Sequence, residues 1–118
     1  MAGIYVHIPF CKKRCSYCDF HFSTTFSSYR EKLIAAICSE LAIRKSELQD
    51  ALVETVYFGG GTPSLLTKEE LAAIMSTIRE HFELADSPEI TFEVNPDDAT
   101  TENLADWKAL GINRLSIG

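Results

Sequence analysis

The sequence lacks long hydrophobic runs, an apolar leader and an excess of basic residues. Its apolar stretches are all much shorter than the roughly 20 residues that a membrane-spanning helix needs. The chain passes from Met1 into a strand-like segment without the charged and apolar regions of a secretory signal. With 11 Lys and Arg against 17 Asp and Glu, its net charge is −6, which argues against unspecific binding to nucleic acid. We therefore expect a cytoplasmic protein with no membrane span and no nucleic-acid partner.

Cysteine is also scarce, but its distribution is informative. The chain has 4 cysteines in 118 residues. Three of them, Cys11, Cys15 and Cys18, occupy one short segment, and a cytosolic chain rarely keeps such a group as disulfides. This clustering indicates metal ligands. The remaining Cys38 follows an apolar helical position and is predicted to be a buried free thiol.

Size and pattern predict the fold class. A chain of this length with 46% hydrophobic and 24% charged residues fits one globular domain. Strand-like segments alternate with helical ones, which predicts an α/β fold with a parallel sheet. The expected strands are residues 4–8, 55–58, 89–94 and 114–117. The expected helices are residues 29–49, a segment from a capping box at Thr67 and Glu70 to Phe82, and residues 101–110 with Leu104, Trp107 and Leu110 inward and Gly111 as the C-terminal cap.

The last strand runs to the end of the chain with no helix after it. We therefore expect residues 1–118 to be the front part of a larger barrel-like domain. In parallel α/β folds, ligands gather at the carboxyl ends of the strands. The cysteines follow the first strand, a glycine run follows the second, and Glu93 ends the third. The sequence thus predicts that all three features share one edge of the sheet.

The number of cysteine ligands favours an iron–sulfur cluster. Closed zinc sites and ordinary iron–sulfur clusters both use four protein ligands. Three thiolates at Cys11, Cys15 and Cys18 would leave one iron of a [4Fe–4S] cluster open to an outside ligand. The neighbouring Lys12, Lys13 and Arg14 favour the thiolate form. A zinc site completed by His21 is the main alternative, and a disulfide is a weaker one.

The glycine run has two interpretations. Residues 59–61, with Thr62 and Pro63 after them, lie between a strand and a helix, and glycine lets backbone amides approach a polar ligand closely. The run is neither a phosphate-binding P-loop nor a dinucleotide fingerprint, because both of those spacings are absent. A ligand contact and a plain turn therefore remain open.

Glu93 stands in an otherwise apolar strand. By alternation it shares a face with Thr91, and in a barrel that face can point into the lumen. A carboxylate there would bind hydroxyl or ammonium groups, and the alternative is a salt bridge to Arg114. His7 is expected in the core.

The chain resembles the radical S-adenosylmethionine (SAM) superfamily. The C-x3-C-x2-C segment after the first strand, with the aromatic Tyr17 before its third cysteine, matches the motif of that superfamily. Within it, the chain is similar to the group of oxygen-independent coproporphyrinogen III oxidases and HemW-type heme chaperones. The segments that carry this second resemblance are Tyr5–Cys11, Tyr57–Ser64, Phe92–Pro96 and Asn113–Gly118.

The resemblance implies a fold, two cofactors and a set of binding residues. The fold would be the N-terminal part of a radical SAM partial (β/α) TIM-like barrel, with residues 1–118 as part of the radical SAM core. Cys11, Cys15 and Cys18 would hold a [4Fe–4S] cluster whose open iron is chelated by the amine and carboxylate of SAM. The reduced cluster would cleave SAM to a 5′-deoxyadenosyl radical. The SAM contacts would come from Tyr5, Tyr17, Gly60, Gly61, Thr62 and Glu93.

The resemblance also implies a role in heme metabolism. The oxidases carry a further cysteine two places after the third, and this chain has Phe20 there, as HemW-type chaperones do. The implied function is heme binding and transfer, with heme bound beyond residue 118. The alternatives are radical SAM oxidative decarboxylation of coproporphyrinogen III and a zinc-stabilised binding module. Expected partners are heme or a porphyrinogen, a heme-acceptor protein, and a reductant such as a flavodoxin-type donor.

Overall fold

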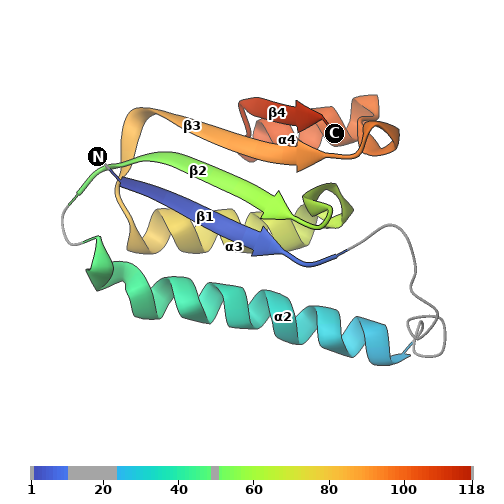
Figure 1. Cartoon of the computed structure of the whole chain (residues 1–118), viewed down its shortest axis with the longest axis horizontal. Coiled ribbons are helices and arrows are strands. Elements are labelled where there is room, and N and C mark those ends of the chain that lie inside the picture. Colours follow the sequence, from blue (N-terminus) through green and yellow to red (C-terminus); the bar gives the residue numbers. More distant parts are fainter. Residues whose placement is uncertain (1, 11–23, 49–50, 118) are drawn as a thin grey trace.

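The computed structural model describes residues 2–10, 24–48 and 51–117, with the backbone alone for residues 24–28. Its four strands form one parallel sheet in the order β1-β2-β3-β4, with the carboxyl ends of all strands at the same edge (Figure 1). The strands are β1 (Ala2–Ile8), β2 (Val53–Gly60), β3 (Leu84–Val94) and β4 (Arg114–Ile117). The predicted α/β class with a parallel sheet is confirmed.

Helices alternate with the strands, as the pattern predicts. They are α2 (Thr24–Ile43), α3 (Lys68–His81) and α4 (Thr101–Ala109), with three short 3₁₀ turns, η1 (Arg44–Glu47), η2 (Pro63–Leu65) and η3 (Pro96–Asp98). Figure 1 shows α3 and α4 behind the sheet and α2 running below the β1 edge. Among the described residues, no helix is long and apolar enough to cross a membrane.

The hydrophobic core lies between the sheet and its helices. The predicted capping box begins α3: Thr67 accepts a hydrogen bond from the Glu70 amide, and the Glu70 carboxylate accepts one from the Thr67 amide. Beyond this cap, the apolar stripe of α3 packs against alternate residues of the strands. The buried residues of this core include Val6, Ile8, Val56, Phe58, Leu71, Ile74, Met75, Ile78, Ile90, Phe92 and Val94.

The predicted bounds of the first helix, residues 29–49, are wrong at both ends. Helix α2 begins at Thr24, within a polar stretch that looks like a loop but contains the Ser and Thr residues that favour helix starts. It ends at Ile43 and continues as the tighter turn η1, as helices often do at their C-termini.

Three strands are longer than predicted. Strand β1 begins at Ala2 and not at residue 4. Strand β2 extends through Gly60, because Gly59 and Gly60 pair with His7 and Ile8 of β1, so the glycine run breaks the strand only at its third member. Strand β3 begins at Leu84, before its predicted start at residue 89. Its pairing with β2 shifts register between these two positions.

The prediction for the helix over residues 101–110 is confirmed in part by α4. Trp107 is buried with its ring 5.2 Å from that of Phe92, and Gly111 follows the helix with a φ of +107°. Leu104 was expected inward, but its side chain is 39% exposed. Leu110, which was also expected inward, packs against the same core as Trp107, so the buried stripe of this short helix runs toward its C-terminus and leaves Leu104 outside it.

Candidate functional site

Backbone hydrogen bonds join the glycine run to the end of β1. The Gly61 amide donates to the Ile8 carbonyl over 2.8 Å, and the Thr62 amide donates to the Phe10 carbonyl over 2.5 Å. Phe10 is the residue before Cys11. The amides of Gly61 and Thr62, which the sequence offers to a ligand, are thus already bonded within the protein. A ligand at this loop would meet carbonyl oxygens and side chains instead.

Close packing explains why glycine is needed in the run. Gly60 has a φ of +109°, and a Cβ there would lie 2.7 Å from the ring of His7. A Cβ on Gly61 would overlap the carbonyl of Phe10. Tight packing therefore accounts for these two glycines without a ligand, and this packing fixes the loop against the strand that leads to the cysteines.

Glu93 is held by a tyrosine and not by the arginine considered above. The Tyr57 hydroxyl donates a 2.7 Å hydrogen bond to the Glu93 carboxylate. This bond stabilises the protonated phenol and raises the pKa of Tyr57 above its usual value of 10.0. Arg114 pairs instead with Glu89, at 3.2 Å on the solvent-exposed surface. The predicted alternative of a Glu93–Arg114 salt bridge is therefore wrong.

Aromatic side chains line the same face of the sheet beside Glu93. The rings of Tyr5 and Tyr57 stack with centroids 5.8 Å apart, and the Tyr5 hydroxyl lies 3.4 Å from Nδ1 of His7. Tyr5 is 58% exposed. His7 was expected in the core, but it is exposed, because its neighbours Val6 and Ile8 take the buried face. His7 and Tyr57 are site residues that sequence reasoning missed, and strand alternation from Tyr5 is the signal that points to His7.

A cavity at the carboxyl edge brings the glycine run and Glu93 together, as predicted. Its volume is about 330 Å³. The lining residues are Gly61, Thr62, Pro63, Glu93, Val94, Asn95 and Ser116. Ser116 was not anticipated, although it pairs in register with Glu93. The cavity offers a carboxylate, hydroxyls and backbone to a small polar ligand, a combination suited to binding ammonium and hydroxyl groups.

A buried serine joins the two turns beside this cavity. Ser64 in η2 donates a 2.8 Å hydrogen bond to Asp98 in η3 and accepts one of 3.1 Å from the Asn95 amide. These bonds join the turn after the glycine run to the turn after β3. The two walls of the cavity are thereby held at a fixed separation.

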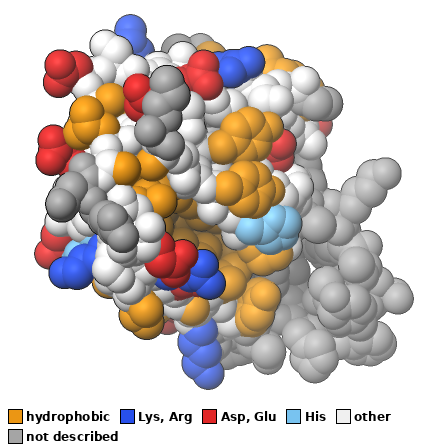
Figure 2. All heavy atoms as spheres, turned by 60° about the vertical axis from the view of Figure 1, so that its left-hand side comes forward, with side chains coloured by type: hydrophobic (Ala, Val, Ile, Leu, Met, Phe, Trp, Pro, Cys, Tyr) orange, Lys and Arg blue, Asp and Glu red, His pale blue; other side chains and the backbone are white. Residues whose placement is uncertain are grey.

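A second cavity, of about 340 Å³, lies away from this edge between β1 and α2. Its lining is mostly apolar and includes Ile37, Leu41 and Phe82, with Glu40 and Arg44 among its charged residues. Figure 2 shows such a hollow, with orange side chains inside and acidic and basic ones near it. Tyr5 and His7 also line this cavity, but it lies away from the carboxyl ends of the strands, where ligands gather in parallel α/β folds, so we do not place the site there.

The predicted cluster ligands Cys11, Cys15 and Cys18 lie outside the described residues, as do Tyr17 and His21. Three thiolates in one segment beside a cationic run are a donor set that suits an iron–sulfur cluster. Cys38 is described: it is a free thiol, half-buried, with Sγ 3.7 Å from the Ala73 carbonyl. It is less buried than predicted.

Comparison with known proteins places these features in a family. The model of the Radical SAM superfamily matches residues 5–118. The heme chaperone HemW of Mycobacterium tuberculosis is 40% identical over 98% of this chain and 30% of its own length. A mitochondrial radical S-adenosyl methionine domain-containing protein 1 of Danio rerio is 38% identical over 99% of this chain and 26% of its own length.

A solved structure agrees with the sequence comparisons. Coproporphyrinogen III oxidase (HemN) from Escherichia coli, described as a radical SAM enzyme, superposes with a TM-score of 0.82 at 31% identity. The match covers 99% of this chain and 27% of the oxidase. The chain therefore spans about a third or less of the length of each of these three relatives.

Proposed function

The chain belongs to the radical SAM superfamily, and on this premise we propose that it is the N-terminal portion of the radical SAM core of a HemW-type heme chaperone. In this proposal the protein binds a [4Fe–4S] cluster and SAM, and takes part in heme binding and transfer. The observation that carries the proposal is the 40% identity to a heme chaperone HemW over 98% of the chain. Phe20 also supports a chaperone over an oxidase, because the oxidases that the chain resembles carry a cysteine at this position.

The residues have distinct roles in this proposal. Cys11, Cys15 and Cys18 would hold the cluster, which when bound supplies one electron to the sulfonium of SAM. Glu93, oriented by the hydrogen bond from Tyr57, would bind a donor group of SAM. The loop at Gly60, Gly61 and Thr62 would present backbone carbonyls to the amine, since the amides of Gly61 and Thr62 are engaged by β1. Tyr5 and Tyr17 would flank the cofactor.

A second candidate function is oxidative decarboxylation of coproporphyrinogen III. The structural similarity to the oxidase HemN favours it, because the match covers almost the whole chain. Both functions need heme or a porphyrinogen and a reductant such as a flavodoxin-type donor, and the chaperone also needs a heme-acceptor protein. We propose the cytoplasm as its location, and cell fractionation would test this against the mitochondrial location in the name of the Danio rerio relative.

Anaerobic reconstitution of the complete natural chain with iron and sulfide tests the cluster. We expect broad thiolate-to-iron absorption and iron bound to the protein. Replacing Cys11 by Ala should abolish most of this iron, whereas Cys38→Ala, a matched change to a free thiol on α2, should leave it unchanged. A colourless protein that holds one zinc ion would contradict the cluster and support the zinc-stabilised module.

Product analysis separates the chaperone from the oxidase. The reconstituted complete chain is incubated with coproporphyrinogen III, SAM and a reductant, and in parallel with heme. We expect stable heme binding and no decarboxylated product. Decarboxylated product would overturn the chaperone and support the oxidase.

A further inference from the structure

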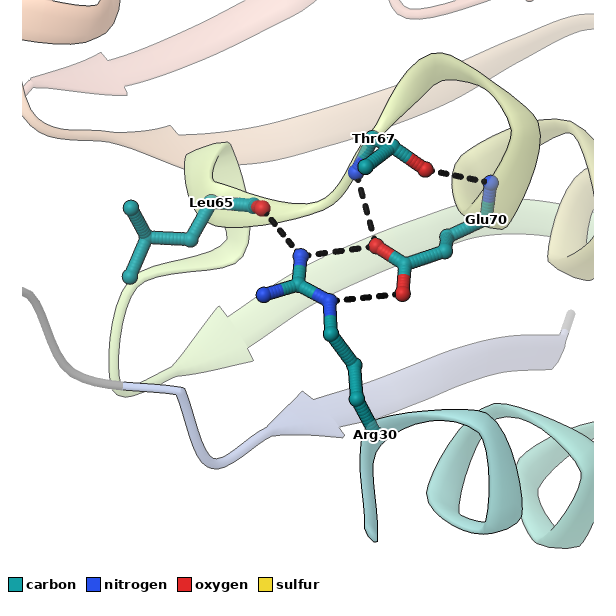
Figure 3. Close-up of polar contacts among 4 residues, drawn as sticks. All are labelled: Arg30, Leu65, Thr67 and Glu70. Atoms are coloured by element: carbon teal, nitrogen blue, oxygen red, sulfur yellow. Dashed lines mark hydrogen bonds and ion pairs between the residues drawn. The ribbon is translucent and has the colours of Figure 1, made fainter. Parts of the chain in front are cut away.

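Arg30 connects four parts of the fold, namely α2, α3, the turn η2 and the residue before Cys11. It lies near the start of α2, and its Nε and one terminal nitrogen each donate a 2.7 Å hydrogen bond to the carboxylate of Glu70 (Figure 3). The same terminal nitrogen donates to the carbonyl of Leu65 in η2. The guanidinium carbon also lies 4.3 Å from the centre of the Phe10 ring, a cation–π contact.

These contacts hold the described parts of the chain on either side of residues 11–23. Phe10 ends the described chain before that segment, and α2 begins at Thr24 directly after it. Arg30 contacts the ring of Phe10, and the Thr62 amide donates a hydrogen bond to its carbonyl. Arg30 fixes α2 to the capping box of α3 through Glu70, so both flanks of the segment are tied to the turn that follows the glycine run.

The geometry of this ion pair is that of a structural anchor. The side chains of Arg30 and Glu70 are only 20% and 16% exposed, and the contact is bidentate. Arg44, on the same helix, pairs with Glu40 at 2.8 Å, but those side chains are 58% and 62% exposed. Exposed pairs of that kind contribute little, whereas a shielded bidentate pair fixes the positions of both partners.

We propose that Arg30 is a positioning residue for the iron–sulfur cluster, acting by holding Phe10 and α2 at the two ends of the cysteine segment. This inference rests on the proposed cluster at Cys11, Cys15 and Cys18. Arg30 itself is not proposed to bind the cluster. Its planar guanidinium donates hydrogen bonds to Glu70 and Leu65 while the face of the same group lies over the ring of Phe10. A lysine ammonium does not reproduce this combination.

The test compares Arg30→Met, Arg30→Lys and the matched control Arg44→Met in the complete natural chain. Each protein is reconstituted with iron and sulfide, and the rate of cluster loss to an iron chelator is followed by absorbance. Substitutions of residues that support metal ligands typically cost about 10–100-fold, so we expect loss about tenfold faster in Arg30→Met. Arg30→Lys should be intermediate, and Arg44→Met should match the wild type.

Two further measurements separate positioning from general stability. Thermal unfolding of the cluster-free proteins shows whether each variant is folded, and electron paramagnetic resonance of the reduced cluster shows whether addition of SAM still shifts its spectrum. Phe10→Leu keeps an apolar side chain but removes the ring beneath the guanidinium, so it should also accelerate cluster loss. It serves as the second variant if Arg30→Met does not fold.

The outcomes are distinct. If the wild type holds a cluster and both Arg30→Met and Phe10→Leu lose it at the wild-type rate, the inference is wrong and the proposed function stands. If Arg44→Met loses the cluster as fast as Arg30→Met, the effect is not specific to this anchor and the inference is also wrong. If the wild type takes up no iron, the proposed function itself fails and the inference fails with it.

Discussion

The two faces of the sheet differ sharply although the same strands form both. The face toward the helices consists of buried apolar side chains such as Ile8, Phe58 and Phe92. The opposite face carries Tyr5, His7, Tyr57 and Glu93, which are exposed or partly exposed and bonded to one another. Successive residues of a strand point to opposite faces, so one step along the chain separates a core residue from a site residue.

This difference shows how stability and binding are divided in the molecule. Parallel sheets are usually covered on both faces and have near-continuous apolar strands. In this chain the residues that hold the fold together and those proposed to bind the cofactor alternate within β1, β2 and β3. Substitutions on the helix-covered face should therefore change unfolding, and substitutions on the open face should change binding.

Removing a ring from the helix-covered face should have the largest effect. Phe92 is fully buried and contacts the rings of Phe58 and Trp107, at 5.7 and 5.2 Å between centroids. We expect Phe92→Ala to lower the free energy of unfolding by about 3–5 kcal/mol, through lost contacts and a cavity. Denaturant-induced unfolding measures this. Tyr5→Ala removes an exposed ring from the opposite face of the same sheet and should change it by less than about 1 kcal/mol, so an equal loss would contradict the comparison.

Neutralising the carboxylate on the open face should affect binding and not folding. Hydrogen bonds to charged groups contribute about 1.5–3 kcal/mol, so Glu93→Gln should weaken SAM binding about tenfold or more. Titration calorimetry of the anaerobic, reconstituted protein measures the affinity. Glu89→Gln, on the same strand but paired with Arg114, is the matched control and should bind SAM like the wild type. Equal weakening in both variants would contradict a specific role for Glu93.

Acid should weaken the fold through the Arg30–Glu70 contact on the helix side. Burial raises the pKa of Glu70, but hydrogen bonds from Arg30 and Thr67 outweigh it and leave that pKa below its usual 4.5. A depressed carboxyl pKa stabilises the protein above pH 4.5, and this stabilisation is lost as the pH falls through the folded-state pKa. Unfolding midpoints measured across this range should therefore fall more steeply in the wild type than in Arg30→Met. Parallel curves would show that the contact does not contribute.

The smallest effect should appear in the titration of Tyr57 on the open face. Because Tyr57 donates to Glu93, its phenol should lose its proton only above pH 10.0. The difference in phenolate absorbance between the wild type and Tyr57→Phe isolates this group. Glu93→Gln removes the charged acceptor and should bring the Tyr57 titration toward lower pH. A Tyr57 that titrates at the same pH with and without the Glu93 carboxylate would show that the two are not coupled.

Local patterns predicted much of the fold. The capping box at Thr67 and Glu70, the cap at Gly111 and the parallel sheet expected from alternating strands and helices all follow from local patterns, and the structure confirms them. The ends of α2 and β2 were less predictable, because polar residues and glycines are compatible with either state. For β2, pairing with β1 decided the outcome.

The partners of the site residues could not be predicted in the same way. That Glu93 accepts from Tyr57 depends on the register between β2 and β3, which a single sequence does not reveal. Arg30 and Glu70 are far apart in the chain and meet only when two helices pack together. The predicted edge at which the glycine run and Glu93 meet is confirmed by their shared cavity, while the cysteine ligands stay a prediction.

The anchors of Phe10 and α2 also have a consequence for the order of synthesis. Both flanks of the cysteine segment attach to residues 61–70, which follow the cysteines in the chain. Translation proceeds at roughly 5–20 residues per second, so the thiols leave the ribosome some seconds before their anchors exist. Stable cluster insertion should therefore wait until α3 has emerged. Until then a newly made chain carries three neighbouring thiols that its own fold does not yet hold in place.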